Sequence, residues 1–218
     1  MLEINKHIPN DVADGAPALV LLHGRGSDKD DLMGLQPGLP QEAVLITPRA
    51  PFPGAPWGYG GGWAWYRFLG GTTPDPASFE RSVAALAELV EALPEILPVK
   101  PGVVIVGGFS QGGTTALGYS LSHPETVDGV LMFSGFLPSH PDVAATPETV
   151  RGRKVFWGHG TLDQMIPFAN AIQGRDALAR AGADLTTGDY RTGHWIDPQE
   201  LADASSWLTS FQTATAGR

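Results

Sequence analysis

Five short, almost entirely apolar runs constrain the fold of this chain more than any other feature of its sequence. They lie at residues 18–22, 43–46, 103–106, 130–133 and 155–157. Runs of this length and composition are typical of strands that are buried on both faces of a parallel sheet. Segments with helical periodicity lie between them. The alternation predicts an α/β fold with a mostly parallel central sheet and helices on both faces.

The clearest helical pattern covers residues 76–97. Its apolar side chains recur at steps of three and four, with Asp75 as the expected N-cap, Pro76 in the first turn, and Pro98 and Pro101 after the end. Three more helices are expected at residues 110–122, 167–181 and 198–211, and one more strand at residues 185–191. Residues 48–76 are the longest connection that these predicted helices and strands leave.

The length and composition favour one domain over residues 1–218. The chain has 218 residues with 42% hydrophobic content, enough for one well-buried core. The small and polar tail, residues 212–218, is expected to fray. Residues 48–76 form a Pro- and Gly-rich segment that carries seven aromatic residues between Phe52 and Phe68. That density argues against a merely solvated loop.

Charge and cysteine content exclude several classes of function. The formal net charge of −9 disfavours a nucleic acid or anionic membrane partner. The absence of cysteine excludes disulfides, thiolate metal sites and a cysteine nucleophile. The longest aliphatic run, residues 19–22, is too short to span a bilayer. The first 14 residues contain no apolar stretch typical of a secretory signal, so a cytoplasmic protein is expected.

One pentapeptide lies at the junction of a predicted strand and a predicted helix. Gly108-Phe109-Ser110-Gln111-Gly112 follows the apolar run at 103–106. A Gly-x-Ser-x-Gly sequence in this place is typical of a tight turn that presents the serine above the sheet as a nucleophile. The positions two before and two after the serine must be almost free of side chain. A serine that only caps the helix would not need both glycines, so Ser110 is the candidate nucleophile.

A serine hydroxyl needs a histidine to accept its proton and usually a carboxylate to orient that histidine. In folds with this turn the acid and then the histidine follow the serine, each on a loop after a later strand. Asp163 lies in Gly158-His159-Gly160-Thr161-Leu162-Asp163, directly after the run that ends at Trp157. His194 follows the strand expected at 185–191. Ser110, Asp163 and His194 are therefore the predicted triad.

Other residues compete for these roles. Asp163 has an alternative interpretation as a simple turn residue. The competing acids are Asp184, Asp189 and Asp197. Among the six histidines, His159 is expected to shape the acid loop, and His23 belongs to a glycine-rich segment. Three more are expected in surface contexts: His7, His123 and His140.

The segment Leu21-Leu22-His23-Gly24-Arg25-Gly26 ends the first apolar run and opens a glycine-rich loop. In this type of fold such a loop supplies a backbone N–H that binds the negative oxygen of a tetrahedral intermediate. The candidate oxyanion donors are the backbone N–H groups of Arg25 and Gln111. The alternative is an ordinary turn at the strand end in which His23 forms a local hydrogen bond.

Together these motifs resemble the phospholipase/carboxylesterase family of α/β-hydrolases, which includes acyl-protein thioesterases. The resemblance runs from about residue 19 to 207, and it rests on His23-Gly24-x-Gly26, Pro48-Arg49-Ala50-Pro51, Phe109-Ser110-Gln111-Gly112-Gly113, His159-Gly160-Thr161-Leu162-Asp163 with Ile166-Pro167, and Gly193-His194. It implies an α/β-hydrolase fold without a large cap, the triad named above, and Arg25 and Gln111 as oxyanion donors. Two features depart from the family: Arg25 replaces a commonly hydrophobic residue, and the stretch 57–68 is rich in tryptophan.

The aromatic segment also suggests where a substrate would bind. The candidates for one wall of a groove are Trp57, Trp63, Trp65, Tyr66 and Phe68, and those for the opposite wall are Phe136 and Leu137. The alternative is that several of the aromatic residues anchor the segment to the protein. Two apolar walls would favour neutral esters. The Arg25 cation near the mouth of the groove would instead affect which acyl group or which alcohol group is preferred.

These residues predict a serine carboxylesterase that hydrolyses short to medium acyl or aryl esters through an acyl-enzyme, with His194 acting first as base and then as acid. The nearest alternative is a thioesterase or lysophospholipase with the same triad, because the triad does not determine the leaving atom. A non-catalytic binding protein on a hydrolase fold is less consistent with an intact triad. The chemistry requires no metal or organic cofactor, and the expected partner is a small-molecule ester; dimerisation through an apolar loop is left open.

Overall fold

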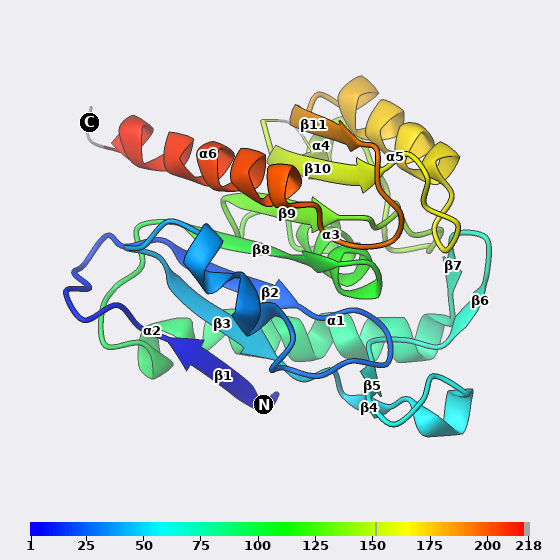
Figure 1. Cartoon of the computed structure of the whole chain (residues 1–218), viewed down its shortest axis with the longest axis horizontal. Coiled ribbons are helices and arrows are strands. Elements are labelled where there is room, and N and C mark those ends of the chain that lie inside the picture. The colour runs from blue at the N-terminus through cyan, green and yellow to red at the C-terminus, as the bar shows by residue number, and fades with distance from the viewer. Residues whose placement is uncertain (151, 216–218) are drawn as a thin grey trace.

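The computed structural model describes residues 1–150 and 152–215, and its centre is a seven-stranded sheet (Figure 1). The strands lie in the order β1-β3-β2-β8-β9-β10-β11, and all neighbours are parallel except the antiparallel pair β1 and β3. The predicted mostly parallel α/β sheet is confirmed. Its strands are β1 (Ile4–His7), β2 (Ala18–Leu22), β3 (Val44–Pro48), β8 (Val104–Phe109), β9 (Gly129–Phe133), β10 (Lys154–Gly160) and β11 (Asp184–Tyr190).

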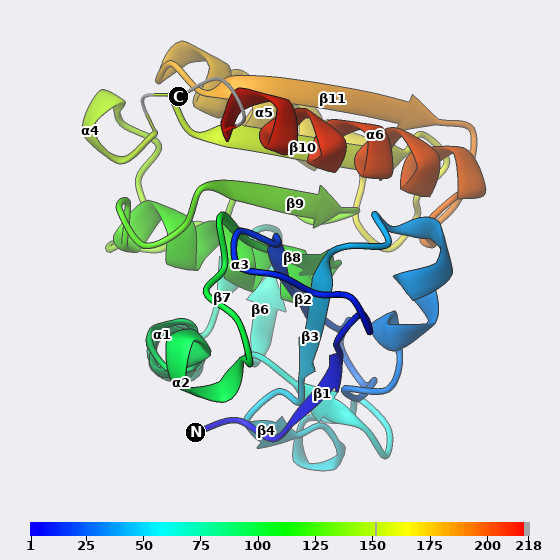
Figure 2. The ribbon, with the colours of Figure 1, turned by 90° about the vertical axis from the view of Figure 1, so that its left-hand side faces the viewer.

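Helices cover both faces of this sheet, and alternate side chains of the strands separate the two cores. Val20 and Leu22 of β2 belong to the core shared with α1 (Pro76–Glu91), α3 (Gln111–Ser122) and α5 (Phe168–Arg180). Leu19 and Leu21 point to the other core, shared with the 3₁₀ helix η1 (Leu32–Gly38) and with α6 (Pro198–Thr215). Figure 2 shows α6 running alongside β10 and β11. In the described part of the chain, no helix is long and apolar enough to cross a membrane.

The predicted helix at 76–97 is interrupted in the structure. The Asp75 N-cap is confirmed, because its Oδ2 accepts a hydrogen bond from the Ser78 N–H at 3.1 Å. However, α1 ends at Glu91 and a separate short helix, α2 (Leu93–Ile96), follows with Pro94 in its first turn. Proline has no N–H to donate to the preceding turn, so the interruption comes earlier than Pro98.

The segment 48–76 folds into two small hairpins rather than an irregular loop. One pairs β4 (Phe52–Pro53) with β5 (Trp63–Ala64) around a 3₁₀ turn, η2 (Ala55–Trp57), and the other pairs β6 (Phe68–Gly70) with β7 (Thr73–Pro74). A short helix, α4 (Pro147–Val150), precedes β10. The tail expected to fray begins inside α6, which continues to Thr215, and residues 216–218 lie outside the described residues.

Glu200, in the first turn of α6, is a fully buried carboxyl group that joins this helix to β10. Its Oε2 accepts a hydrogen bond from the Asp197 N–H at 3.2 Å. Its Oε1 packs against Gly158, where an added Cβ would lie only 2.1 Å away, and has no hydrogen-bond partner among residues 1–150 and 152–215. Burial raises the pKa of Glu200 to about 8, so the carboxyl is protonated at neutral pH.

This proton makes the stability of the protein depend on pH. The folded protein holds it up to a pH of about 8, whereas the ordinary pKa of the group is 4.5, so folding takes up a proton between these values. The free energy of unfolding should fall as pH rises through this window, by at most about 1.4 kcal/mol per pH unit. Urea denaturation at about pH 5.5 and about pH 7.5 should show a smaller decrease for Glu200→Gln than for the wild type. An equal decrease in both proteins would contradict this role.

Candidate active site

Ser110 occupies a tight turn between β8 and α3. Its backbone φ is 54° and its N–H donates to the Phe133 carbonyl at 2.8 Å. A non-glycine residue with positive φ is uncommon and marks backbone strain. A Cβ on Gly108 or on Gly112 would lie 2.2 or 2.1 Å from the Leu22 carbonyl oxygen. The two flanking glycines therefore let the turn press against the end of β2, as the sequence pattern predicted.

The three residues of the predicted triad lie within hydrogen-bond distance of one another. His194, on the loop after β11, places its Nδ1 2.6 Å from the Asp163 Oδ2. Its Nε2 lies 2.9 Å from the Ser110 Oγ. The carboxylate can only accept, so the Nδ1–H donates to it and the Nε2 lone pair faces the serine hydroxyl. This is the arrangement that a proton transfer from serine to histidine requires.

The acid loop holds its carboxylate in one orientation. The Asp163 side chain is fully buried, and its Oδ1 accepts hydrogen bonds from the N–H groups of Met165 and Ile166, each at 2.8 Å. The fully buried His159 donates from Nε2 to the Ile166 carbonyl at 2.9 Å and lies 3.5 Å from the Asp163 Oδ2. Burial lowers the pKa of His159, which keeps the ring neutral. These contacts agree with the predicted part of His159 in shaping the acid loop.

The competing acids lie elsewhere. Asp189 pairs with Arg175 at 2.5 Å, Asp197 accepts from the Gln199 N–H at 2.8 Å, and Asp184 is exposed at the start of β11. One histidine differs from expectation: His140 is buried, because it packs 5.2 Å from the ring of Phe79, between centroids. His7 and His123 are half-buried.

The two candidate oxyanion donors come from different parts of the sheet edge. Arg25 follows β2, and Gln111 is the first residue of α3. Within residues 1–150 and 152–215, neither backbone N–H has a hydrogen-bond partner, and both residues line the same cavity as Ser110. His23 supports the first loop: its Nδ1 donates to the Gly24 carbonyl at 2.7 Å and its Nε2 accepts from the Ala50 N–H at 3.1 Å. Burial lowers the pKa of His23, so the ring is neutral and can serve as donor and acceptor at once.

A cavity of about 540 Å³ opens above Ser110 and His194. Of the residues expected on the groove walls, Tyr66, Phe68 and Phe136 line it. The sequence analysis did not predict that Phe109, Met165 and Ile166 line the cavity. Their positions next to Ser110 and Asp163 in the sequence could have indicated it. The further lining residues are Gly24, Ser27, Asp31, Phe109, Gln164, Met165 and Ile166.

Four residues expected on the groove walls do not line this cavity: Trp57, Trp63, Trp65 and Leu137. Trp65 is fully buried, and its indole Nε1 donates to the His23 carbonyl at 2.9 Å. Trp63 is held by backbone bonds to the loop after β2, and its ring lies 4.9 Å from the Arg49 guanidinium. Leu137 packs into the core instead. For Trp63 and Trp65 the anchoring alternative describes the structure, because each forms a hydrogen bond to the end of β2 or the loop after it.

The Gln111 side chain joins the aromatic segment to the serine turn. Its Oε1 accepts from the Trp65 N–H at 2.8 Å, and its Nε2 donates to the Tyr66 carbonyl at 2.7 Å. All of these groups are buried. Gln111 therefore combines a backbone N–H next to Ser110, unpaired within the described part of the chain, with a side-chain clamp on the cavity wall.

Gln111→Ala should lower the free energy of unfolding substantially. The change leaves the buried Trp65 N–H and Tyr66 carbonyl without partners, at about 1–3 kcal/mol for each group. Chemical denaturation measures this loss. Gln199→Ala, which removes an exposed hydrogen bond to Asp203, is the matched control. If the two variants lost equal stability, the clamp would not have the importance inferred for it.

Comparisons with known proteins agree with this geometry. The model of the family described as Phospholipase/Carboxylesterase matches residues 5–212. A probable carboxylesterase of Oryza sativa subsp. japonica is 33% identical over 54% of this chain, but the match covers only 45% of that protein. A second probable carboxylesterase from the same rice is 28% identical over 90% of this chain and 88% of its own length. Acyl-protein thioesterase 1 of Eremothecium gossypii is 28% identical over 88% of this chain and 86% of that protein.

Solved structures share the fold. The crystal structure of the Bacillus cereus carboxylesterase has a TM-score of 0.82 at 21% identity and covers 96% of this chain and 94% of that one. Zea mays acyl-protein thioesterase 2 has a TM-score of 0.78 at 22% identity, over 96% of this chain and 99% of that one. With a family match that extends over residues 5–212, this chain belongs to the phospholipase/carboxylesterase family of α/β-hydrolases.

Proposed function

We propose that this protein is a serine carboxylesterase that hydrolyses short to medium acyl or aryl esters, with Ser110, Asp163 and His194 as its triad. The observation that carries the proposal is the His194 ring, which lies 2.6 Å from the Asp163 carboxylate on one side and 2.9 Å from the Ser110 hydroxyl on the other. Names of similar proteins, carboxylesterases and acyl-protein thioesterases, support the same chemistry.

In the proposed reaction the Ser110 oxygen attacks the ester carbonyl carbon while the His194 Nε2 takes its proton. The negative carbonyl oxygen is bound by the backbone N–H groups of Arg25 and Gln111, which are free to donate. The C–O bond to the alcohol then breaks, and the His194 Nε2–H protonates the leaving oxygen. Water, deprotonated by His194, attacks the acyl-Ser110 carbonyl, and Ser110 leaves with the proton returned by His194. Asp163 stays ionised and stabilises the imidazolium in both halves.

The size and lining of the cavity support the proposal that the substrates are small esters. Its volume of about 540 Å³ lies within the range of sites for small molecules. Aromatic and aliphatic side chains from three segments of the chain surround the reacting groups: Tyr66 and Phe68, Phe136, and Met165 with Ile166. Apolar walls of this kind bind acyl chains or aromatic alcohols by excluding water.

Labelling with a fluorophosphonate probe tests the nucleophile. The wild-type protein should be labelled at Ser110, because the probe traps a serine activated by a neighbouring histidine. Ser110→Ala should abolish both labelling and ester hydrolysis, and His194→Ala should lower both by a thousandfold or more, on the order of the loss seen when a triad member is removed. The exposed Ser206→Ala serves as control. An unlabelled wild-type protein would favour a binding protein on a hydrolase fold.

A thioesterase or lysophospholipase activity of the same triad is the second candidate, favoured by the similarity to proteins named acyl-protein thioesterase. A panel of oxygen and sulfur esters with identical acyl groups separates the candidates. We expect kcat/KM for the oxygen esters to equal or exceed that for the thioesters after correction for their different rates in buffer. Far faster turnover of thioesters would overturn the esterase assignment and leave the triad intact.

A further inference from the structure

Arg25 brings a positive charge to the wall of the cavity. The residue lines the cavity together with Ser110 and His194, and its side chain is exposed. Its guanidinium carbon lies 4.7 Å from the centre of the Tyr59 ring. The charge also acts on the Tyr66 phenol: burial raises the pKa of Tyr66 well above its ordinary value, and Arg25 is among the groups that oppose the rise. The guanidinium therefore lies near a residue of the cavity wall.

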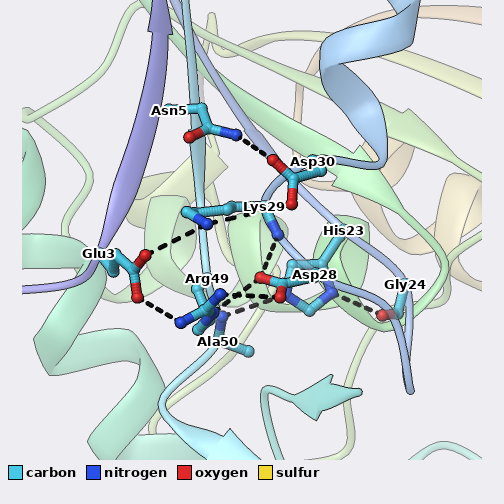
Figure 3. A network of polar contacts seen from close by, with 9 residues as sticks. All are labelled: Glu3, Asn5, His23, Gly24, Asp28, Lys29, Asp30, Arg49 and Ala50. Atoms are coloured by element: carbon cyan, nitrogen blue, oxygen red, sulfur yellow. Dashed lines mark hydrogen bonds and ion pairs between the residues drawn. The ribbon is translucent and has the colours of Figure 1, made fainter. Parts of the chain in front are cut away.

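The other cations of the same loop region are already neutralised (Figure 3). Arg49 donates two hydrogen bonds to the Asp28 carboxylate, at 2.7 and 2.9 Å, and pairs with Glu3. Lys29 pairs with Glu3 at 3.1 Å and lies 4.0 Å from Asp30. The Arg49 guanidinium holds the pKa of Asp28 below its ordinary value. Asp28 and Asp30, the acidic residues closest to Arg25 in the sequence, are therefore already in contact with other cations.

Arg25 itself has no such partner. Among the described residues, its guanidinium forms no ion pair or hydrogen bond, and the Tyr59 ring is its one aromatic contact. That ring is fixed, because the Tyr59 hydroxyl accepts a hydrogen bond from the Phe68 N–H at 2.8 Å. Contact with an aromatic face restricts a guanidinium but leaves the N–H groups at its edge free. Those donors match the two oxygens of a carboxylate or phosphate.

We propose that Arg25 forms an anion-binding subsite, and that the preferred substrates are esters carrying a carboxylate or phosphate a few bonds from the scissile carbonyl. The inference rests on the proposed function. The short separation follows because the backbone N–H of the same residue faces the oxyanion in that proposal. One opposing charge is present: Asp31 also lines the cavity, and its Oδ2 accepts from the Ser27 hydroxyl at 2.8 Å. The apolar walls alone would favour neutral esters, and the subsite shifts this preference toward esters that carry a negative charge.

Two matched pairs of substrates test the subsite. In the first pair, monomethyl glutarate carries a carboxylate in its acyl half and methyl pentanoate is its neutral partner. In the second pair, 2-acetoxyethyl phosphate carries a phosphate in its alcohol half and 2-methoxyethyl acetate is its neutral partner. The measured quantity is the ratio of kcat/KM for the charged substrate to that for its neutral partner. We expect a ratio above one for at least one pair, and that pair identifies the half of the ester that faces Arg25.

Variants then assign the preference to Arg25. Arg25→Leu should lower the ratio about tenfold or more, as expected for loss of hydrogen bonds to a charged group. Arg25→Lys should retain part of the preference, and Asp31→Asn should raise it by removing the like charge. Arg67→Leu removes an equal positive charge from an exposed residue outside the cavity and should leave the ratio unchanged. Thermal unfolding of each variant shows that the changes are not due to loss of fold.

The outcomes distinguish this inference from the function on which it rests. Hydrolysis of neutral esters with ratios below one for both pairs, or with a ratio that Arg25→Leu does not change, overturns the subsite and keeps the esterase. A ratio that falls equally in Arg67→Leu also overturns it, because long-range charge alone would then explain the preference. No hydrolysis of any of the four substrates, together with no fluorophosphonate labelling, overturns the proposed function itself.

Discussion

The close approach of the serine turn to the end of β2 is the constraint on which the rest of the site depends. Gly108 and Gly112 both face the Leu22 carbonyl oxygen at distances that exclude a side chain. This contact brings the start of α3, with Gln111, beside the end of β2, where the loop that carries Arg25 begins. Ser110, held at a φ of 54°, lines the same cavity as Arg25 and Gln111 and places its Oγ 2.9 Å from the His194 Nε2. The strain of one residue is compensated by the packing of two strands and a helix around it.

The parallel sheet brings the remaining groups together without any special local sequence. Asp163 follows β10 and His194 follows β11, and adjacent parallel strands end at the same edge of the sheet. The loops then fix the orientation of these side chains. Backbone N–H groups hold the Asp163 carboxylate. Two buried neutral histidines form hydrogen bonds to backbone atoms: His23 stabilises the loop after β2 that carries Arg25, and His159 stabilises the acid loop. The site is therefore positioned mainly by main-chain contacts.

The central strands and the proximity of Ser110, Asp163 and His194 could be predicted from the sequence because they leave simple signals. Fully buried strands are continuous apolar runs, Ser110 and Asp163 directly follow such runs, and His194 follows a later, more polar strand in the expected order. Features that depend on a partner elsewhere in the chain left no such signal. The edge strand β1 has the half-exposed sequence Ile-Asn-Lys-His, which forms a strand only because β3 offers free backbone groups. Trp65 is buried because the His23 carbonyl accepts its indole N–H, and no local pattern encodes that pairing. His140 is buried by a contact with Phe79 from another element.

The clamp formed by the Gln111 side chain also indicates where this scaffold tolerates redesign. Tyr66 lies on a segment tied by hydrogen bonds to the helix that follows Ser110, so remodelling that wall would also shift the residues around Ser110. Gln164 and Met165 also line this cavity and are exposed, while the acid loop that carries them is held through its main chain. Divergence in substrate range, natural or engineered, has its least costly route through these two positions.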